Sequence, residues 1–145
     1  MLALTRKTGY ALSAMTYLAE LSPGQVASSR QIAGISGAPM SLLMNVMKEL
    51  AAAGYVESIR GARGGYRLAR SPKEINLADL VTAIEGPLRL AECVIDKAVE
   101  GECSRQEMAH CPIADPVHRV QRKLRDFLKK MTLSEITGTS IGSVG

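Results

Sequence analysis

The order of helices and helix breakers near the N-terminus constrains the fold of this chain more than any other sequence feature. Apolar residues recur at helical spacing over 5–21, and Pro23-Gly24 then ends the helix. A short helix is expected over 30–36 and a third over 40–53, separated only by Gly37-Ala38-Pro39. Two helices joined by so short a turn are the parts of a helix-turn-helix.

A glycine-rich hairpin is expected directly after the third helix. Residues 55–59 alternate and are rich in β-formers, and 66–68 can return as a second strand after Gly61, Gly64 and Gly65. A hairpin in this position is the wing of a winged helix. The predicted fold class is therefore mainly α with a small β wing, a winged helix-turn-helix domain followed by a long C-terminal dimerisation helix.

The candidate DNA-binding side chains lie on the wing and on the outward side of the helix-turn-helix. Four arginines and no acidic residue occur within residues 60–70, which favours contact with phosphates and with a narrow minor groove. Ser and Asn on the third helix can hydrogen-bond base edges, and a methionine on its solvent side suggests contact with a partner. The competing interpretation is an ordinary solvated hairpin beside a plain polar helix face. The candidates are Arg30, Met40, Ser41, Met44, Asn45, Lys48, Arg60, Arg63 and Arg67.

Charge divides the chain into three parts. Residues 1–70 have eight basic and three acidic side chains, residues 71–112 have four and eight, and residues 113–145 have six and three, which gives balances of +5, −4 and +3. The basic N-terminal part suits phosphate binding. The acidic middle part would be repelled by DNA, so it is expected to have a function other than DNA binding.

Composition and motifs exclude several classes of function. Aromatic residues make up only 3% of the chain, with no Trp and one Phe, so the core must be built from aliphatic residues and Met, which favours packed helices. No apolar run could span a bilayer and the N-terminus lacks a signal-peptide core, so we expect a cytoplasmic protein with no membrane partner. No acid–base pair, phosphate-binding loop or nucleophile elbow indicates an enzyme. A protein-interaction module and an iron–sulfur carrier are the competing classes, and salt-dependent DNA binding would separate the first of them.

A helix with a heptad-like apolar seam is expected from residue 113. Its opposite face is basic, and the Gly/Ser/Thr-rich tail after Thr137 is expected to be disordered. The seam can fold back on its own domain or form a homodimer interface over 113–131; we favour the dimer, because helix-turn-helix proteins commonly bind two half-sites. The seam residues are Ile113, Val117, Val120, Leu124, Phe127 and Met131.

Three cysteines cluster between the wing domain and this helix. Cys93, Cys103 and Cys111 have the spacing Cys-x9-Cys-x7-Cys, and thiolates suit zinc or iron–sulfur clusters. Three thiolates leave a fourth ligand open: His118, His110, an acidic side chain, a partner chain or a small thiol. Independent redox or metal-responsive thiols remain the alternative.

With these features, the chain resembles the Rrf-type family of winged-helix transcriptional regulators. Within the family it resembles the IscR-like and NsrR-like branches, and most of all the regulators of iron–sulfur assembly operons. The resemblance covers nearly the whole chain. It rests on Leu4-Thr5, Gly9-Tyr10-Ala11-Leu12, Gly54-Tyr55-Val56, Arg60-Gly61-Ala62-Arg63-Gly64-Gly65-Tyr66-Arg67-Leu68, Thr82-Ala83-Ile84-Glu85-Gly86 and Met131-Thr132-Leu133-Ser134-Glu135.

The resemblance implies a dimeric regulator of a double-stranded DNA operator, not an enzyme. It implies that Ser41 and Asn45 reach the major groove, that Arg60 reaches the minor groove, and that the three cysteines hold an iron–sulfur cluster, for which we favour 2Fe–2S over 4Fe–4S. The IscR-like pattern has a histidine where this chain has Ala114, and the NsrR-like pattern has an acidic residue where it has Gly9. The fourth ligand therefore stays open.

The expected organisation has four parts. Residues 1–87 form the winged helix-turn-helix domain, 88–112 the cysteine-bearing cluster loop, 113–137 the dimerisation helix and 138–145 a disordered tail.

Overall fold

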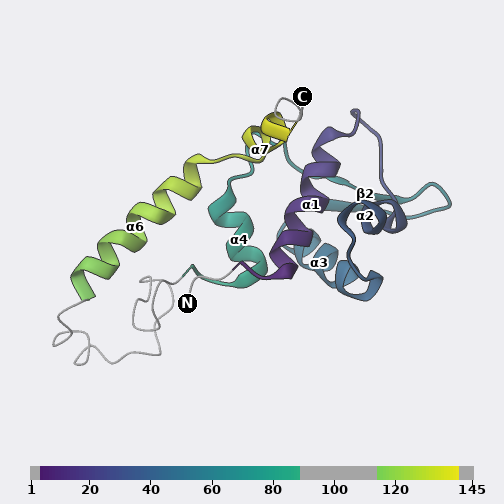
Figure 1. The fold of residues 1–145 in the computed structure, drawn as a ribbon. Helices are drawn as coiled ribbons and strands as arrows, with labels where there is room; N and C mark the ends of the chain where they lie inside the picture. Colours follow the sequence, from purple (N-terminus) through teal and green to yellow (C-terminus); the bar gives the residue numbers. More distant parts are fainter. Residues whose placement is uncertain (1–3, 89–113, 141–145) are drawn as a thin grey trace.

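The computed structural model describes residues 4–88 and 114–140. Its elements form a mainly helical fold with one small hairpin, as predicted, and the hairpin and the long C-terminal helix lie at opposite ends of the molecule (Figure 1). The elements are α1 (Arg6–Glu20), α2 (Ser29–Ser36), α3 (Met40–Ala52), β1 (Val56–Ile59), β2 (Gly65–Leu68), α4 (Leu77–Glu85), α6 (Ala114–Lys130) and α7 (Leu133–Ser140).

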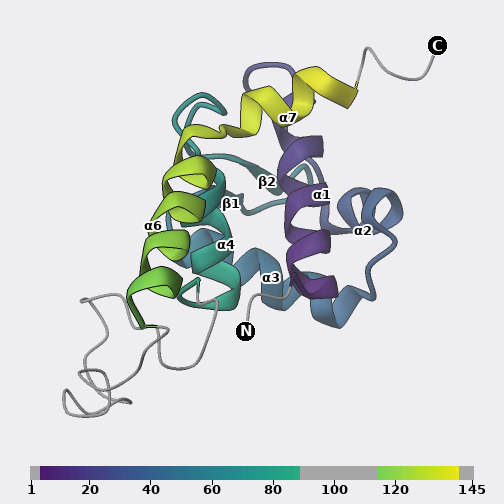
Figure 2. The ribbon, with the colours of Figure 1, turned by 60° about the vertical axis from the view of Figure 1, so that its left-hand side comes forward.

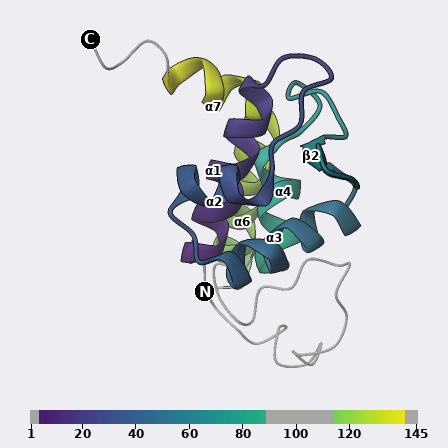
Figure 3. The same ribbon diagram turned by 90° about the vertical axis from the view of Figure 1, so that its right-hand side faces the viewer.

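Local signals set the ends of the two helices of the helix-turn-helix. The Ser28 side chain accepts a hydrogen bond from the Gln31 backbone, and the Gln31 side chain accepts one from the Ser28 backbone, which makes a capping box at the start of α2. Gly37 ends α2 in the left-handed conformation, at φ 69°. The chain then turns through Pro39 into α3, and Figure 3 shows the two helices meeting at this short connection.

The wing is an antiparallel hairpin in which Val56 pairs with Leu68 and Ile59 with Gly65. The sequence did not predict the third segment that joins it. Ala27, in the connection between α1 and α2, pairs with Tyr66 through backbone N···O distances of 2.9 and 2.8 Å. The hairpin is therefore fixed to the helical part of the domain by its own backbone.

The core lies where α1, α2, α3 and α4 meet. α3 contributes the apolar stripe that its periodicity predicts, Leu43, Val46, Met47 and Leu50, whereas α2 buries only Ile32 and leaves Ile35 exposed. The largest fully buried side chains of the core are Met15, Ile32, Leu43, Met47, Leu50, Ile75, Leu80 and Leu133.

The C-terminal region contains two helices, so the prediction of one helix over 113–137 is wrong. The Met131 carbonyl accepts from the Leu77 backbone at 2.9 Å and the Leu133 backbone donates to Ile75 at 2.8 Å, so the chain is extended between α6 and α7. Thr132 and Glu135 have capping-box spacing, and the Glu135 carboxylate accepts from the Thr132 backbone at 3.3 Å. The second helix continues to Ser140, beyond the predicted start of the disordered tail. It packs on α1.

The long helix α6 lies beside α4 (Figure 2), and its apolar seam is divided between two environments. Val117 and Leu124 are partly buried, whereas Val120 and Phe127 are 55% and 60% exposed. Gln121 is buried, and its side-chain amide donates a hydrogen bond to the Leu88 carbonyl. Ile113, the first residue of the predicted seam, lies outside the described residues.

Candidate nucleic-acid interface

The outward face of α3 presents most of the predicted base-contacting side chains. Ser41, Asn45 and Lys48 are exposed, and Met40 is 42% exposed at the first position of the helix. Met44, expected on the solvent side, is partly buried instead. Ser41, Asn45 and Lys48 lie opposite the buried stripe of α3, so packing of the helix onto the core turns them outward, whereas Met40 and Met44 lie along the border of that stripe.

The tip of the wing brings two arginines into solvent. Arg60 and Arg63 are exposed in the turn between β1 and β2, where the Gly64 N–H donates to the Gly61 carbonyl at 3.0 Å. A Cβ at Gly64 would lie 2.2 Å from the Ile59 carbonyl oxygen, so the turn requires glycine there. The tight turn holds both guanidinium groups at the end of the hairpin.

The two arginines nearer the base of the wing have partners within the protein. Arg67 lies opposite Glu57 across the hairpin, and its Nε is 2.7 Å from a Glu57 oxygen. The Arg70 guanidinium lies 5.1 Å from the centre of the Tyr55 ring, a cation–π distance. Burial raises the pKa of Tyr55, Asp79 adds to this rise, and Arg70 opposes it. The positive charge of the wing is therefore least neutralised by neighbouring groups at Arg60 and Arg63.

Arg30 occupies the second position of α2 and is exposed. In helix-turn-helix proteins the first helix of the motif crosses the DNA backbone, where such a side chain can meet a phosphate. It comes from a different element from the other candidates, so the predicted DNA contacts arise from α2, α3 and the wing.

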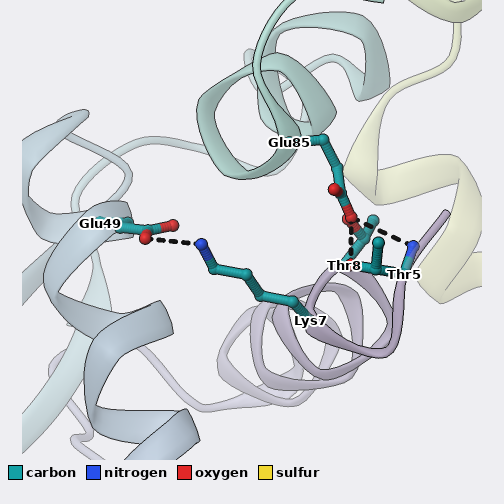
Figure 4. Close-up of polar contacts among 5 residues, drawn as sticks. All are labelled: Thr5, Lys7, Thr8, Glu49 and Glu85. Atoms are coloured by element: carbon teal, nitrogen blue, oxygen red, sulfur yellow. Dashed lines mark hydrogen bonds and ion pairs between the residues drawn. The ribbon is translucent and has the colours of Figure 1, made fainter. Parts of the chain in front are cut away.

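Two carboxylates fix the first turn of α1, and neither contact was predicted from the sequence (Figure 4). The Lys7 ammonium lies 2.6 Å from an oxygen of Glu49 on α3. Glu85, at the end of α4, accepts hydrogen bonds from the Thr5 and Thr8 hydroxyls and from the Thr5 backbone. The start of α1 is thereby joined to α3 through Glu49 and to the end of α4 through Glu85. The chain continues from the end of α4 into the cysteine-bearing segment.

These hydrogen bonds lower the pKa of Glu85, with the Thr5 hydroxyl as the largest cause and Thr8 next. A lowered folded-state pKa stabilises the fold above the unfolded carboxyl pKa, about 4.3, and that stability is lost as the pH falls through the folded value. We expect Glu85→Gln to lower the free energy of unfolding by about 1 kcal/mol at pH 7, a figure reduced for solvent exposure. The difference from wild type should vanish in acid, as measured by urea unfolding from pH 7 to pH 3.

Glu74→Gln is the matched control, because Glu74 is an exposed carboxylate in the loop before α4. It should stay within about 0.5 kcal/mol of wild type at pH 7. A Glu85→Gln variant as stable as this control at neutral pH would contradict the contact.

The predicted cluster ligands fall almost entirely outside the described residues. Cys93, Cys103, Cys111 and His110 lie between Leu88 and Ala114, the two residues that bound this part of the chain. His118 is described: it lies on the second turn of α6 and is partly buried. As a donor set, three thiolates and an imidazole suit iron.

A helix-turn-helix with an outward polar face, followed by a hairpin with exposed arginines at its tip, defines a winged-helix DNA-binding protein. Among the described residues, no helix combines the length and apolarity needed to cross a membrane. A family model described as an iron-dependent transcriptional regulator, Rrf2, matches residues 4–139. The chain belongs to the Rrf2 family of transcriptional regulators, as its motifs predicted.

Individual relatives agree with this assignment. The chain is 35% identical over 137 residues to the putative HTH-type transcriptional regulator rrf2-like of Rhodobacter capsulatus, covering 92% of this chain and 91% of the relative. It is 38% identical over 90 residues to the HTH-type transcriptional regulator NsrR of Bacillus subtilis, a match that spans 62% of each chain. These relatives are transcriptional regulators and not enzymes, in line with the sequence analysis.

Two solved structures have the same fold. CymR, described as the global cysteine regulator of B. subtilis, superposes with a TM-score of 0.72 at 28% identity, covering 96% of this chain and 98% of its own. T. potens IscR superposes with a TM-score of 0.72 at 25% identity, covering 99% of this chain and 93% of its own.

Proposed function

We propose that this protein is a cytoplasmic transcription regulator that binds a double-stranded DNA operator as a homodimer, under the control of an iron–sulfur cluster. The observation that carries the DNA-binding part is the outward face of α3 beside a wing whose tip arginines are exposed. In this proposal Ser41, Asn45 and Lys48 enter the major groove, while Arg60 enters the minor groove. Arg30, Arg63 and Arg67 contact phosphates, Arg67 least because Glu57 already neutralises it. Two half-sites would lie about 34 Å apart.

Arg60→Ala is expected to weaken binding to a selected operator by about 5- to 150-fold, because a minor-groove contact is worth about 1–3 kcal/mol. Arg63→Ala should instead reduce the slope of log K against log salt by about one, as expected for a lost phosphate contact. Fluorescence anisotropy with the operator over a series of salt concentrations measures both effects.

Arg122→Ala is the control for charge. Arg122 is exposed on α6, at the opposite end of the molecule from the wing, so its removal should leave the affinity nearly unchanged (Figure 1). Equal effects of Arg60→Ala and Arg122→Ala would mean that the wing does not touch DNA.

The cluster part of the proposal is supported by the iron dependence in the family's description and by the chemistry of Cys93, Cys103 and Cys111. When bound, a cluster would supply metal–thiolate bonds that can help to order the segment that holds its ligands. This segment leads from α4, which Glu85 fixes to α1, into α6. A change in its order would therefore act on the placement of α6, and through the dimer on the spacing of the two recognition helices.

Anaerobically purified wild-type protein is expected to be brown, with broad visible absorption. The variants Cys93→Ala, Cys103→Ala and Cys111→Ala should each lose this absorption, because each removes one of three thiolate ligands. Iron and sulfide analysis separates 2Fe–2S, which we favour, from 4Fe–4S. The spectra of His118→Ala and His110→Ala test the two histidines as fourth ligand, with an acidic side chain, a partner subunit or a small thiol as the remaining candidates.

The likeness to the cysteine regulator CymR favours a second candidate function, in which the three cysteines act as redox or metal-responsive thiols without a cluster. A colourless anaerobic protein whose operator affinity changes on thiol oxidation would establish this function in place of the first. The DNA-binding part of the proposal is common to both.

A further inference from the structure

Two methionines lie along one edge of the outward face of α3. Met40 is 42% exposed, and Met44 follows one turn later, partly buried. Residues four apart on a helix are neighbours, so the two thioether side chains form a continuous apolar strip beside Ser41 and Asn45. The buried stripe of α3 consists of Leu43, Val46, Met47 and Leu50, and the two methionines lie along its border, where Met40 stays exposed and Met44 stays partly exposed.

The first two turns of α3 are otherwise uncharged. Residues 40–47 contain no acidic or basic side chain, and of the two charged residues that follow, Glu49 is bound to Lys7. The outward face at these turns therefore offers a hydroxyl, an amide and two thioethers. In the major groove the only apolar group on a base edge is the C5-methyl of thymine, and the base that pairs with an asparagine amide is adenine.

We propose that Met40 and Met44 contact thymine methyl groups, so that the base pairs under the first two turns of α3 are A·T pairs recognised by shape and apolar contact. This inference rests on the proposed function, since it needs α3 in the major groove. It adds a preference for the methyl group itself, which neither the wing arginines nor Asn45 would give.

The test uses the full chain and a duplex selected with it from a randomised DNA pool. Each thymine of one half-site is replaced in turn by deoxyuridine, which removes only the methyl group, and affinity is measured by anisotropy at fixed salt. Wild-type protein should lose about fourfold in affinity at one or two positions, the effect of exposing one buried methyl. At those positions Met40→Ala or Met44→Ala should reduce the deoxyuridine effect to below about 1.5-fold.

Ile35→Ala is the matched control, because Ile35 is an exposed apolar residue on α2. It should keep the full deoxyuridine effect, and circular dichroism should show that all three variants are folded. Deoxyuridine effects that are absent in wild type, or unchanged in both methionine variants, would overturn the proposal while leaving DNA binding by α3 intact. If no duplex is selected at all, the proposed function fails and the inference fails with it.

Discussion

Gly65→Ala should lower the free energy of unfolding by about 2–3 kcal/mol, the upper part of the range for a forced overlap in a packed site. A Cβ at this position would lie 2.3 Å from the Ala27 carbonyl oxygen, which itself accepts from the Tyr66 N–H at 2.8 Å. The methyl group cannot be accommodated unless the wing separates from the connection between α1 and α2. Urea unfolding followed by circular dichroism measures the loss.

Gly34→Ala is the control for this prediction. Nothing lies within 4 Å of a Cβ at Gly34, and the residue is inside α2, where Ala is favoured over Gly by up to about 1 kcal/mol. It should be neutral or slightly stabilising. A Gly65→Ala variant as stable as Gly34→Ala would mean that Ala27 and Tyr66 are not paired.

Phe127→Lys is expected to convert a dimer into a monomer at micromolar concentration. Phe127 and Val120 are seven residues apart and remain exposed while α6 rests on α4, so they are the part of the seam available to a second copy. Burial of a Phe side chain is worth about 1.5–3 kcal/mol, and a twofold interface contains it twice. Dimerisation should therefore weaken by at least about 100-fold, as measured by sedimentation.

Asp126→Lys introduces the same side chain about 100° round the helix from Phe127 and should leave the dimer intact. Leu124 is a poorer test position, because it is partly buried in its own chain and a charge there would also disturb the fold. If Phe127→Lys sediments like wild type, the exposed stripe of α6 is not the interface.

Helix ends that a single sequence can reveal depend on local chemistry. The bounds of α4 follow from Asn76, whose side chain accepts from the Asp79 backbone, and from Gly86, which stops the helix. The turn between α2 and α3 follows from Gly37 and Pro39 in the same way. Each of these signals acts within four residues, so a single sequence is enough to reveal it.

The features that were missed depend on contacts between distant residues. Leu133 is fully buried although it lies far along the chain from the rest of the core, and its position depends on pairing with Ile75. The partners Lys7–Glu49 and Thr5–Glu85 are also long-range, and nothing in their local sequence specifies them. The capping-box spacing of Thr132 and Glu135 was a local signal that could have shown the start of α7.

For the candidate site, periodicity was sufficient to place Ser41, Asn45 and Lys48 on the outward face of α3. It could not separate Arg60 from Arg67, because the pairing of Arg67 with Glu57 depends on the register of the hairpin. The roles of the cysteines stay predictions, since they depend on chemistry outside the described residues.

The hydrogen bond between Gln121 and Leu88 has a consequence for the length of the cysteine-bearing segment. It joins Leu88, where that segment begins, to a residue of α6 about two turns after Ala114, so much of the entropy of closing the loop is already lost when the described residues fold. Each doubling of a closed loop costs only about 0.6 kcal/mol more, so a few residues added or removed between the cysteines should change stability by a few tenths of a kcal/mol. The spacing of the thiols can therefore vary widely on this fold without disturbing the domain that holds them.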